Sequence, residues 1–192
     1  MKSIAVIIHA RMKSTRCPQK HLRDLGDGNT ILDIALHKVS DLKNVYEKYL
    51  AVHEQALKDR VIKLLEENKI SGNAYQCDLS NDEEILSMKD CISNDHGKLD
   101  GIIHSAAFAP RDQLSGKYLD NITREGFSIA HDISSYSFTA LAKVFKDCLN
   151  DSASLVTLSY IGSKKVVQNY NLMGVAKASL ESSVMYLADS LG

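Results

Sequence analysis

The sequence predicts an α/β protein with a doubly wound parallel sheet of the Rossmann-like kind. Short apolar runs alternate along the chain with longer segments of helical periodicity, which is typical of repeated βα units. The clearest run, Ile4–Ile8, has no polar side chain, as expected of a strand covered by helices on both faces. The length of 192 residues suffices for one sizeable core, so residues 1–192 are expected to form a single domain.

Five short runs are expected to form the strands of this sheet. The first is entirely apolar, and the last is rich in apolar and β-branched residues, which favour extended structure. The expected strands are residues 4–8, 49–52, 74–77, 101–105 and 155–159.

The segments between these strands are expected to be helical. In the helix at residues 56–68, for example, four apolar residues share one face: Leu57, Val61, Leu64 and Leu65. Ser80 followed by Glu83 has the spacing of a capping box, which predicts the start of a further helix. The remaining expected helices are residues 31–42, 127–149 and 170–191.

The composition argues against several classes of function. A net charge of −1 gives no electrostatic footprint for nucleic acid or an anionic membrane. The apolar runs are too short to span a bilayer, and the start has no signal-peptide pattern. The four cysteines lie far apart without zinc-ligand spacing, so reduced thiols and no metal site are expected. Together these features indicate a cytoplasmic protein.

Two tyrosines and a lysine form the most informative local pattern. Tyr160 follows the apolar run Ala153–Ser159, and Tyr170 opens the last expected helix. Tyr170 and Lys177 are seven residues apart, close to two helical turns, so both should lie on one face. A phenol near an ammonium is suited to proton transfer, and the cation favours the phenolate. The alternative is that the tyrosines merely pack at the end of a strand.

Several long and unusual sequence words surround this pattern. They are Gln76–Asp78, His104–Pro110, Thr123–Phe127, Ile129–Phe138, Leu158–Tyr160 and Tyr170–Lys177. With these words in this order, residues 56–192 resemble the bacterial enoyl-acyl-carrier-protein reductases, a divergent branch of the short-chain dehydrogenase/reductase superfamily.

The resemblance implies an NADH-dependent oxidoreductase of fatty acid synthesis. Hydride would pass to the β-carbon of a trans-2-enoyl thioester carried on acyl carrier protein or coenzyme A. Tyr170 would donate the proton to the enolate oxygen, Tyr160 would assist, and Lys177 would hold the nicotinamide ribose. In that family, helices of the kind expected at residues 127–149 form the contacts between subunits, so a homo-oligomer is expected.

The resemblance also assigns contacts to cofactor and substrate. Asp78 would bond the adenine edge, Leu79 would touch the ring, and Ala106 would lie under the adenosine ribose. Ala109 matches a backbone position near the acyl carbonyl. For Asp78 the alternative is a turn or helix-capping role.

A basic loop follows the first strand in place of the glycine-rich turn expected of a reductase. It carries the pattern ARxxSTRxPxKxL, so residues 1–50 are similar to the nucleotide-binding start of sugar-activating cytidylyltransferases. Arg11, Ser14, Arg16 and Lys20 are candidates to bind phosphate, because arginine forks bind phosphate bidentately. The alternative is a solvated basic loop. A seam between the two parts is expected at about residues 45–72.

The reductase family continues beyond the position of Gly192 with two more strands, so the resemblance implies a C-terminally truncated sheet. The leading interpretation is an enoyl reductase-like enzyme with weak dinucleotide binding, because side chains in the basic loop block close backbone approach. One alternative is a cytidylyltransferase-like nucleotide-sugar enzyme. Another is an inactive fusion or scaffold protein.

Overall fold

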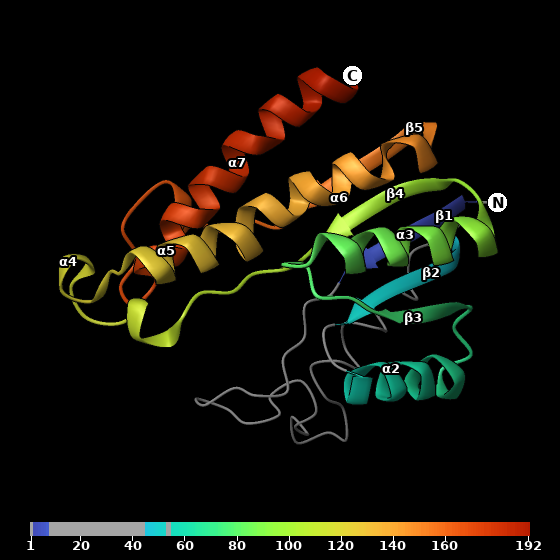
Figure 1. The fold of residues 1–192 in the computed structure, drawn as a ribbon, viewed down its shortest axis with the longest axis horizontal. Coiled ribbons are helices and arrows are strands. Elements are labelled where there is room, and N and C mark those ends of the chain that lie inside the picture. Colours follow the sequence, from blue (N-terminus) through green and yellow to red (C-terminus); the bar gives the residue numbers. More distant parts are fainter. Residues whose placement is uncertain (1, 8–44, 53–54) are drawn as a thin grey trace.

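The computed structural model describes residues 2–7, 45–52 and 55–192 (Figure 1). Its side chains are described from Lys58 onward, His96 excepted. The helix expected at residues 31–42 lies outside the described residues. So do the four candidate phosphate-binding residues, Arg11, Ser14, Arg16 and Lys20.

A five-stranded, all-parallel sheet forms the centre of the described structure. In spatial order the strands are β3 (Gly72–Gln76), β2 (Val45–Val52), β1 (Lys2–Ile7), β4 (Leu99–His104) and β5 (Leu149–Thr157). The chain extends the sheet to one side of β1 and then returns to build the other side from β4. This strand order is that of a doubly wound, Rossmann-like sheet, and it confirms the predicted fold class.

The register shows where a ligand would meet this sheet. Ile7 of β1 pairs with His104 of β4, and His104 pairs with Thr157 of β5, so three strands end at the same edge. In doubly wound sheets, ligands bind at this carboxyl edge, close to the point where the strand order reverses. Here that point lies between β1 and β4.

The helices connect the strands and cover the sheet. Their bounds are α2 (Gln55–Glu67), α3 (Asp82–His96), α4 (Tyr118–Asn121), α5 (Arg124–His131), α6 (Ser137–Phe145) and α7 (Asn171–Leu191). α3 and α6 lie side by side on one face of the sheet, and α7 packs beside α5 and α6 (Figure 1).

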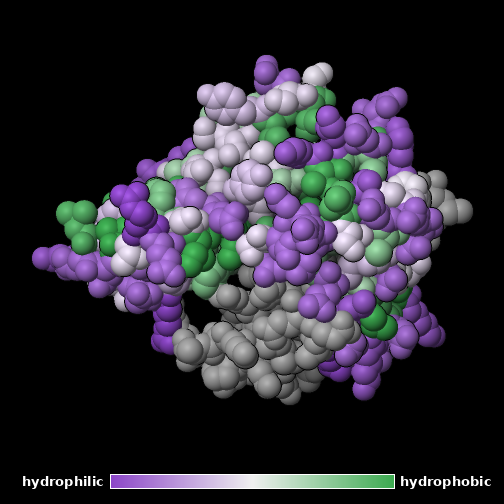
Figure 2. All heavy atoms as spheres, in the orientation of Figure 1, coloured by the Kyte–Doolittle hydropathy of each residue, from purple (hydrophilic) through white to green (hydrophobic). Residues whose placement is uncertain are grey.

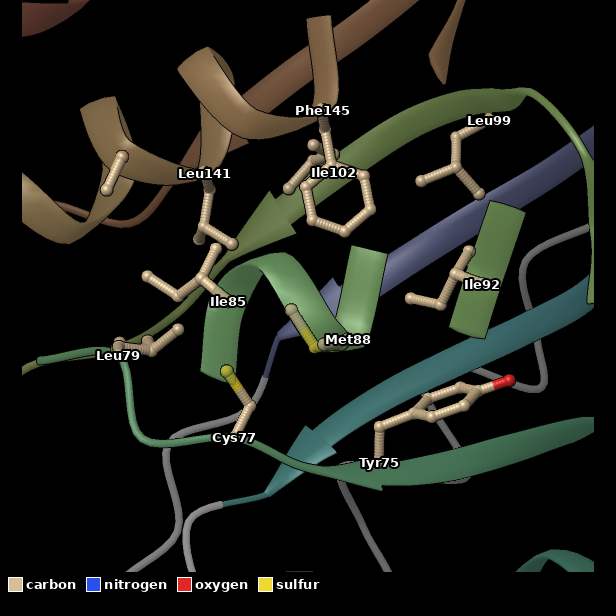
Figure 3. Close-up of a cluster of buried hydrophobic side chains, with 12 residues drawn as sticks. Tyr75, Cys77, Leu79, Ile85, Met88, Ile92, Leu99, Ile102, Leu141 and Phe145 are labelled. Atoms are coloured by element: carbon tan, nitrogen blue, oxygen red, sulfur yellow. The ribbon is translucent and has the colours of Figure 1, made fainter. Parts of the chain in front are cut away.

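The main described core lies between this helix pair and the sheet (Figure 3). Ile85 and Ile92 of α3 and Leu141 and Phe145 of α6 are fully buried against Ile102 of β4. Burying such a side chain contributes about 1.5–3 kcal/mol, so this cluster fixes how α3 and α6 sit on β4.

The long helix expected at residues 127–149 is not a regular α-helix. It begins at Arg124 as α5, widens into a π-helical segment at Asp132–Tyr136, and continues as α6. After one 3-10 turn the chain enters β5 at Leu149, which corrects the expected end of the helix and the start of the strand. A single wider turn barely alters apolar periodicity, so the sequence pattern does not reveal it.

The start of α3 is a second correction. The N-cap is Asn81 and not Ser80: the Asn81 side chain accepts hydrogen bonds from the N–H groups of Glu83 (3.0 Å) and Glu84 (3.3 Å). The Ser80 hydroxyl instead donates to Asp78 at 2.7 Å. Both residue types are good caps, so the competing bond to Asp78 decides between them.

Polar residues cover most of the face seen in Figure 2, with small apolar patches between them. Within the part of the chain that the structure describes, no helix combines the length and apolarity needed to cross a membrane.

Candidate active site

A cleft of about 480 Å³ opens at the carboxyl edge of β4 and β5. It lies where residues after each strand approach the beginning of α7. Its lining comprises Ser105, Ala107, Leu158, Ser159, Tyr160, Val167, Gln168, Tyr170 and Lys177. The three residues expected from the sequence to carry chemistry, Tyr160, Tyr170 and Lys177, therefore line one cleft.

A buried histidine holds the two strand ends together below this cleft. His104, fully buried, contacts Thr157 Oγ1 through Nδ1 (2.8 Å) and Ser137 Oγ through Nε2 (2.9 Å). The Ser137 hydroxyl gives its own proton to Ile133 O, so it accepts from His104 and Nε2 carries the proton. This network joins β4 and β5 to Ser137, the first residue of α6, and to Ile133 of the π-helical segment before it.

The loop after β4 is held by a second hydroxyl. Ser134, in the π-helical segment, accepts a hydrogen bond from Phe108 N–H and donates one to Phe108 O, both at 2.8 Å. Because Ser134 is fully buried, these two bonds are shielded from competing water. They hold the backbone of Phe108, next to Ala107 of the cleft lining.

Two tyrosine rings meet at the rim of the cleft. Tyr160 follows β5 and is half exposed, and Tyr170 directly precedes α7 and is partly buried. Their ring centroids are 4.8 Å apart at an interplanar angle of 59°, a favourable tilted arrangement.

The backbone around Tyr170 is unusual on both sides. Asn169 has a φ of 60° and Asn171 a φ of 26°, in the left-handed region that residues other than glycine seldom occupy. The Asn171 side chain donates to Gly116 O at 3.1 Å, which helps to hold this conformation. Such backbone strain is frequent where a side chain must be presented in a fixed direction.

Two glycines allow the turn at residues Ile161–Ser163 to lie directly against α7. A Cβ atom at Gly162 would overlap the Tyr170 ring, and one at Gly174 would lie 2.7 Å from Gly162 O. Neither glycine was among the predicted site residues, although glycine inside a helical pattern, as at Gly174, is itself a sign of close packing.

Burial dominates the electrostatics of Tyr170. It raises the pKa of the phenol, and the neighbouring Tyr160 raises it further. The expectation that Lys177 would favour the phenolate was wrong for this structure, because desolvation disfavours the charged form. A neutral phenol is the form that can donate a proton at neutral pH.

Lys177 lies in the second turn of α7 and is 5 % exposed. Its Nζ donates to Leu158 O at 2.7 Å, and burial lowers its pKa. An ammonium has three N–H donors, so two beyond this bond can serve a ligand. A buried cation with donors to spare can hold the hydroxyls of a sugar.

The remaining predicted contacts lie further away. Ala106 is fully buried in the core cluster of Figure 3, and Ala109 packs with Ala130 and Leu172 in a second cluster. Neither lines the cleft, whereas the exposed Ala107 between them does. Contacts of Ala106 and Ala109 with a ligand stay predictions.

The residues after β3 are engaged locally. Asp78 Oδ1 accepts from the Ser80 N–H (2.9 Å) and hydroxyl, and the Asp78 N–H donates to Glu84 (2.8 Å). This is the turn role that the sequence left open as an alternative. Leu79 is 4 % exposed and belongs to the core cluster. The predicted contacts of both residues with adenine stay predictions.

The parallel sheet, its strand order and the tyrosine–lysine cleft at its carboxyl edge together define a short-chain dehydrogenase/reductase. A family model described as "Enoyl-(Acyl carrier protein) reductase" matches residues 46–192, well over half of the chain. The chain therefore belongs to the enoyl-(acyl carrier protein) reductase family.

Curated relatives agree with this assignment. The enoyl-[acyl-carrier-protein] reductase [NADH] FabI of Buchnera aphidicola subsp. Acyrthosiphon pisum is 48 % identical over 138 residues, which is 72 % of this chain and 53 % of the relative. The Escherichia coli enzyme of the same name is 51 % identical over 122 residues, covering 64 % of this chain and 47 % of that protein. The chain thus spans about half the length of the curated relatives it matches.

Solved structures show the same fold. A Bacillus cereus enoyl-acyl carrier protein reductase with NADP+ and indole naphthyridinone superposes with a TM-score of 0.79 at 33 % identity, covering 100 % of this chain and 67 % of that one. The Anaplasma phagocytophilum reductase in complex with NAD superposes with a TM-score of 0.80 at 32 % sequence identity. That match covers 100 % of this chain and 66 % of the Anaplasma chain.

A second family model, described as "Cytidylyltransferase", matches residues 5–71. It overlaps the reductase match at residues 46–71, which contain all of β2 except its first residue, Val45, and all of α2.

Proposed function

We propose that the chain is an NADH-dependent enoyl-acyl-carrier-protein reductase, acting on a trans-2-enoyl thioester of acyl carrier protein or coenzyme A. The observation that carries this proposal is the meeting of Tyr160, Tyr170 and Lys177 in one cleft at the carboxyl edge of the sheet. The relatives named above are reductases that use NADH by name, and their family is that of this chain.

The cleft fits the nicotinamide end of such a cofactor. Lys177 is a buried cation with donors beyond its bond to Leu158 O, and the small residues Ser105 and Ala107 leave room beside it. When bound, NADH supplies the hydride that reduces the double bond. Lys177 would hold the ribose hydroxyls and so orient the reacting ring.

Tyr170 is suited to the proton-transfer half of the reaction. Hydride addition to the β-carbon leaves negative charge on the thioester oxygen as an enolate, and a neutral phenol can stabilise or protonate it. A phenol is already neutral at neutral pH, and burial raises the pKa of Tyr170 further above its ordinary value. Tyr160, in ring contact with Tyr170 and half exposed, would orient the thioester from the open side.

Substitution of the two central residues tests the proposal. Tyr170→Phe should lower NADH oxidation with crotonyl-coenzyme A by about 10²- to 10⁴-fold, the usual contribution of general acid catalysis. Lys177→Ala should also lower it, because the ribose hydroxyls would lose the group proposed to hold them. Tyr118→Phe and Lys98→Ala are matched controls at exposed positions outside the helices assigned to subunit contact and should leave turnover unchanged. Normal turnover in both site variants would refute the assignment.

A composite origin of the chain is supported by the two family matches. The cytidylyltransferase match begins before β2 and the reductase match continues to the end, and their overlap at residues 46–71 falls within the seam predicted at 45–72. Arg11, Ser14, Arg16 and Lys20 would then meet the cofactor phosphates. Calorimetric titration with NADH at two salt concentrations tests this, since binding through charged side chains should weaken as salt screens their attraction to the phosphates.

Nucleotidyl transfer is the second candidate function, and the match of residues 5–71 is what favours it. Release of pyrophosphate from CTP in the presence of an acidic sugar would identify it. A chain that is silent in both assays would be the inactive fusion or scaffold protein.

A homo-oligomer and a cytoplasmic location complete the proposal. Several large apolar side chains on α7 are exposed, among them Met185 at 65 % and Tyr186 at 74 %, which suits a subunit contact. Light scattering at micromolar concentration would detect the association, and a clean monomer would contradict it.

A further inference from the structure

Glu181 lies on α7, four residues beyond Lys177, and it does not line the cleft. Its carboxylate nevertheless contacts three side chains of the segment that carries Tyr160. Ser159 Oγ donates to Glu181 Oε1 at 2.5 Å, and Ser163 Oγ donates to the same oxygen. Lys164 Nζ lies 2.5 Å from the other oxygen, Oε2.

The two serines stand on either side of the tyrosine. Ser159 precedes Tyr160 directly, and Ser163 closes the following turn, where its N–H donates to Tyr160 O at 2.9 Å. One carboxylate oxygen therefore holds both ends of the turn against α7. Because Tyr170 and Lys177 are placed by α7 itself, this tether connects Tyr160 to the same rigid element.

The three contacts are not equal in strength. The Lys164 side chain is 70 % exposed, so water and salt screen its ion pair with Glu181. Hydroxyl bonds to an ionised carboxylate are roughly twice as strong as neutral ones. Lys164, then Ser159 and Ser163, lower the pKa of Glu181 to about 2, so the acceptor is ionised at neutral pH. The serine bonds are thus expected to fix the turn, and the Ser163 bond more firmly than the Ser159 bond, because the first is partly buried and the second is exposed.

We propose that Glu181 is a positioning residue: through Ser159 and Ser163 it sets the place of Tyr160 against Tyr170 and the cleft. Where it concerns turnover, this inference rests on the proposed reductase function. Loss of the tether would let the Tyr160 ring move away from its tilted contact with the Tyr170 ring, in which the ring centroids are 4.8 Å apart. A displacement of this kind reduces the rate of the chemical step while binding of NADH, held by Lys177, is retained.

The test compares variants that remove different parts of the tether. Glu181→Ala removes all three contacts, and the double variant Ser159→Ala/Ser163→Ala removes only the hydroxyl bonds. Both should lower kcat by about 10-fold or more with little change in the KM for NADH. Glu181→Gln keeps an amide oxygen for the serines and should recover most of the loss. Lys164→Ala removes only the ion pair and should behave as the unaltered protein.

Fluorine NMR of the protein labelled with fluorotyrosine gives a readout that needs no activity. Tyr160→Phe and Tyr170→Phe assign the two resonances, whose shifts depend on the mutual ring current. Both should move in Glu181→Ala and in the double serine variant but stay in place in Lys164→Ala.

Unmoved tyrosine resonances in Glu181→Ala and in the double serine variant would overturn the inference. So would equal kcat losses in Lys164→Ala and Glu181→Ala. If the unaltered protein shows no turnover, the reductase proposal fails, and the NMR comparison still decides the tether. Should Glu181→Ala not fold, the double serine variant gives the same decision.

Discussion

Replacement of Gly174 by alanine tests how α7 meets the turn that carries Tyr160. Alanine inside a helix is favoured over glycine by about 1 kcal/mol, so helix propensity alone would make Gly174→Ala more stable than the unaltered protein. The structure opposes this gain, because the new Cβ would lie 2.7 Å from Gly162 O. That oxygen belongs to the backbone and cannot rotate away as a flexible side chain would.

Whether Gly174→Ala stabilises or destabilises the protein depends on how much the overlap between the new Cβ and Gly162 O costs. A carbon–oxygen contact needs roughly 3.2 Å or more, so the turn must retreat by about 0.5 Å. Overpacking of this kind costs about 1–3 kcal/mol, with the upper part of the range expected where backbone must move. Subtracting the propensity gain leaves a net loss of about 1–2 kcal/mol. For a chain of this size, that lowers Tm by about 2–8 °C.

Urea unfolding followed by circular dichroism measures this change, and Ala178→Gly is the matched control. Ala178 is exposed one turn further along α7, so its replacement reports the propensity term alone, about 1 kcal/mol of destabilisation. If Gly174→Ala proves more stable by the same amount, the close approach of Gly162 to α7 is not a constraint. The reasoning about how the two tyrosines are held would then be refuted.

Two further predictions concern stability alone. Asn81→Ala removes the side chain that caps α3 and should lower the free energy of unfolding by about 1 kcal/mol in urea titration, whereas Ser80→Ala should cost less. Alkaline pH should also destabilise the protein, since burial raises the pKa of Cys77 to about 12 from an ordinary value of 9.0. The stability that depends on the protonated thiol is fully present below pH 9.0 and is lost as pH rises toward 12, and the loss amounts to roughly 1 kcal/mol by pH 10. Tyr75, whose pKa burial raises to about 12, adds to the loss above pH 10. Cys77→Ala should flatten the decline between pH 8 and 10, and replacement of the exposed Cys91 should not; an equal slope in both variants would contradict the assignment.

The sequence predicted the residues that line the candidate site, but it did not predict the hydrogen-bond partners that hold them in place. Tyr170 and Lys177 were predictable because helical spacing is local, and Tyr160 because it follows an apolar run that reads as a strand. The same reasoning expected a lowered pKa for Tyr170. It failed because the degree of burial, which here raises that pKa, depends on segments remote in sequence.

The supports of the site come from such remote segments. Glu181 meets Ser159 across 22 positions, and Ser137 meets His104 across 33. Ser134 reaches Phe108 across 26 positions from a π-helical turn that apolar periodicity does not register. No local sequence pattern indicates that a particular serine or glutamate will form a hydrogen bond with a residue so far away in the sequence.

The sequence by itself determined the class of fold and identified three side chains that line the candidate active site, Tyr160, Tyr170 and Lys177. The periodicity of each segment shows which face of its strand or helix is apolar and must be buried. Alternating strand and helix segments therefore predict a parallel doubly wound sheet covered by helices. Only the tertiary structure decided that β4 lies beside β1 and that Asn81 caps α3. It alone decided, too, that Tyr160 is held against α7. These outcomes depend on which polar groups and backbone segments come into contact once the apolar faces are buried. Such contacts join residues that are close in space but distant in the sequence, so local sequence patterns do not predict them.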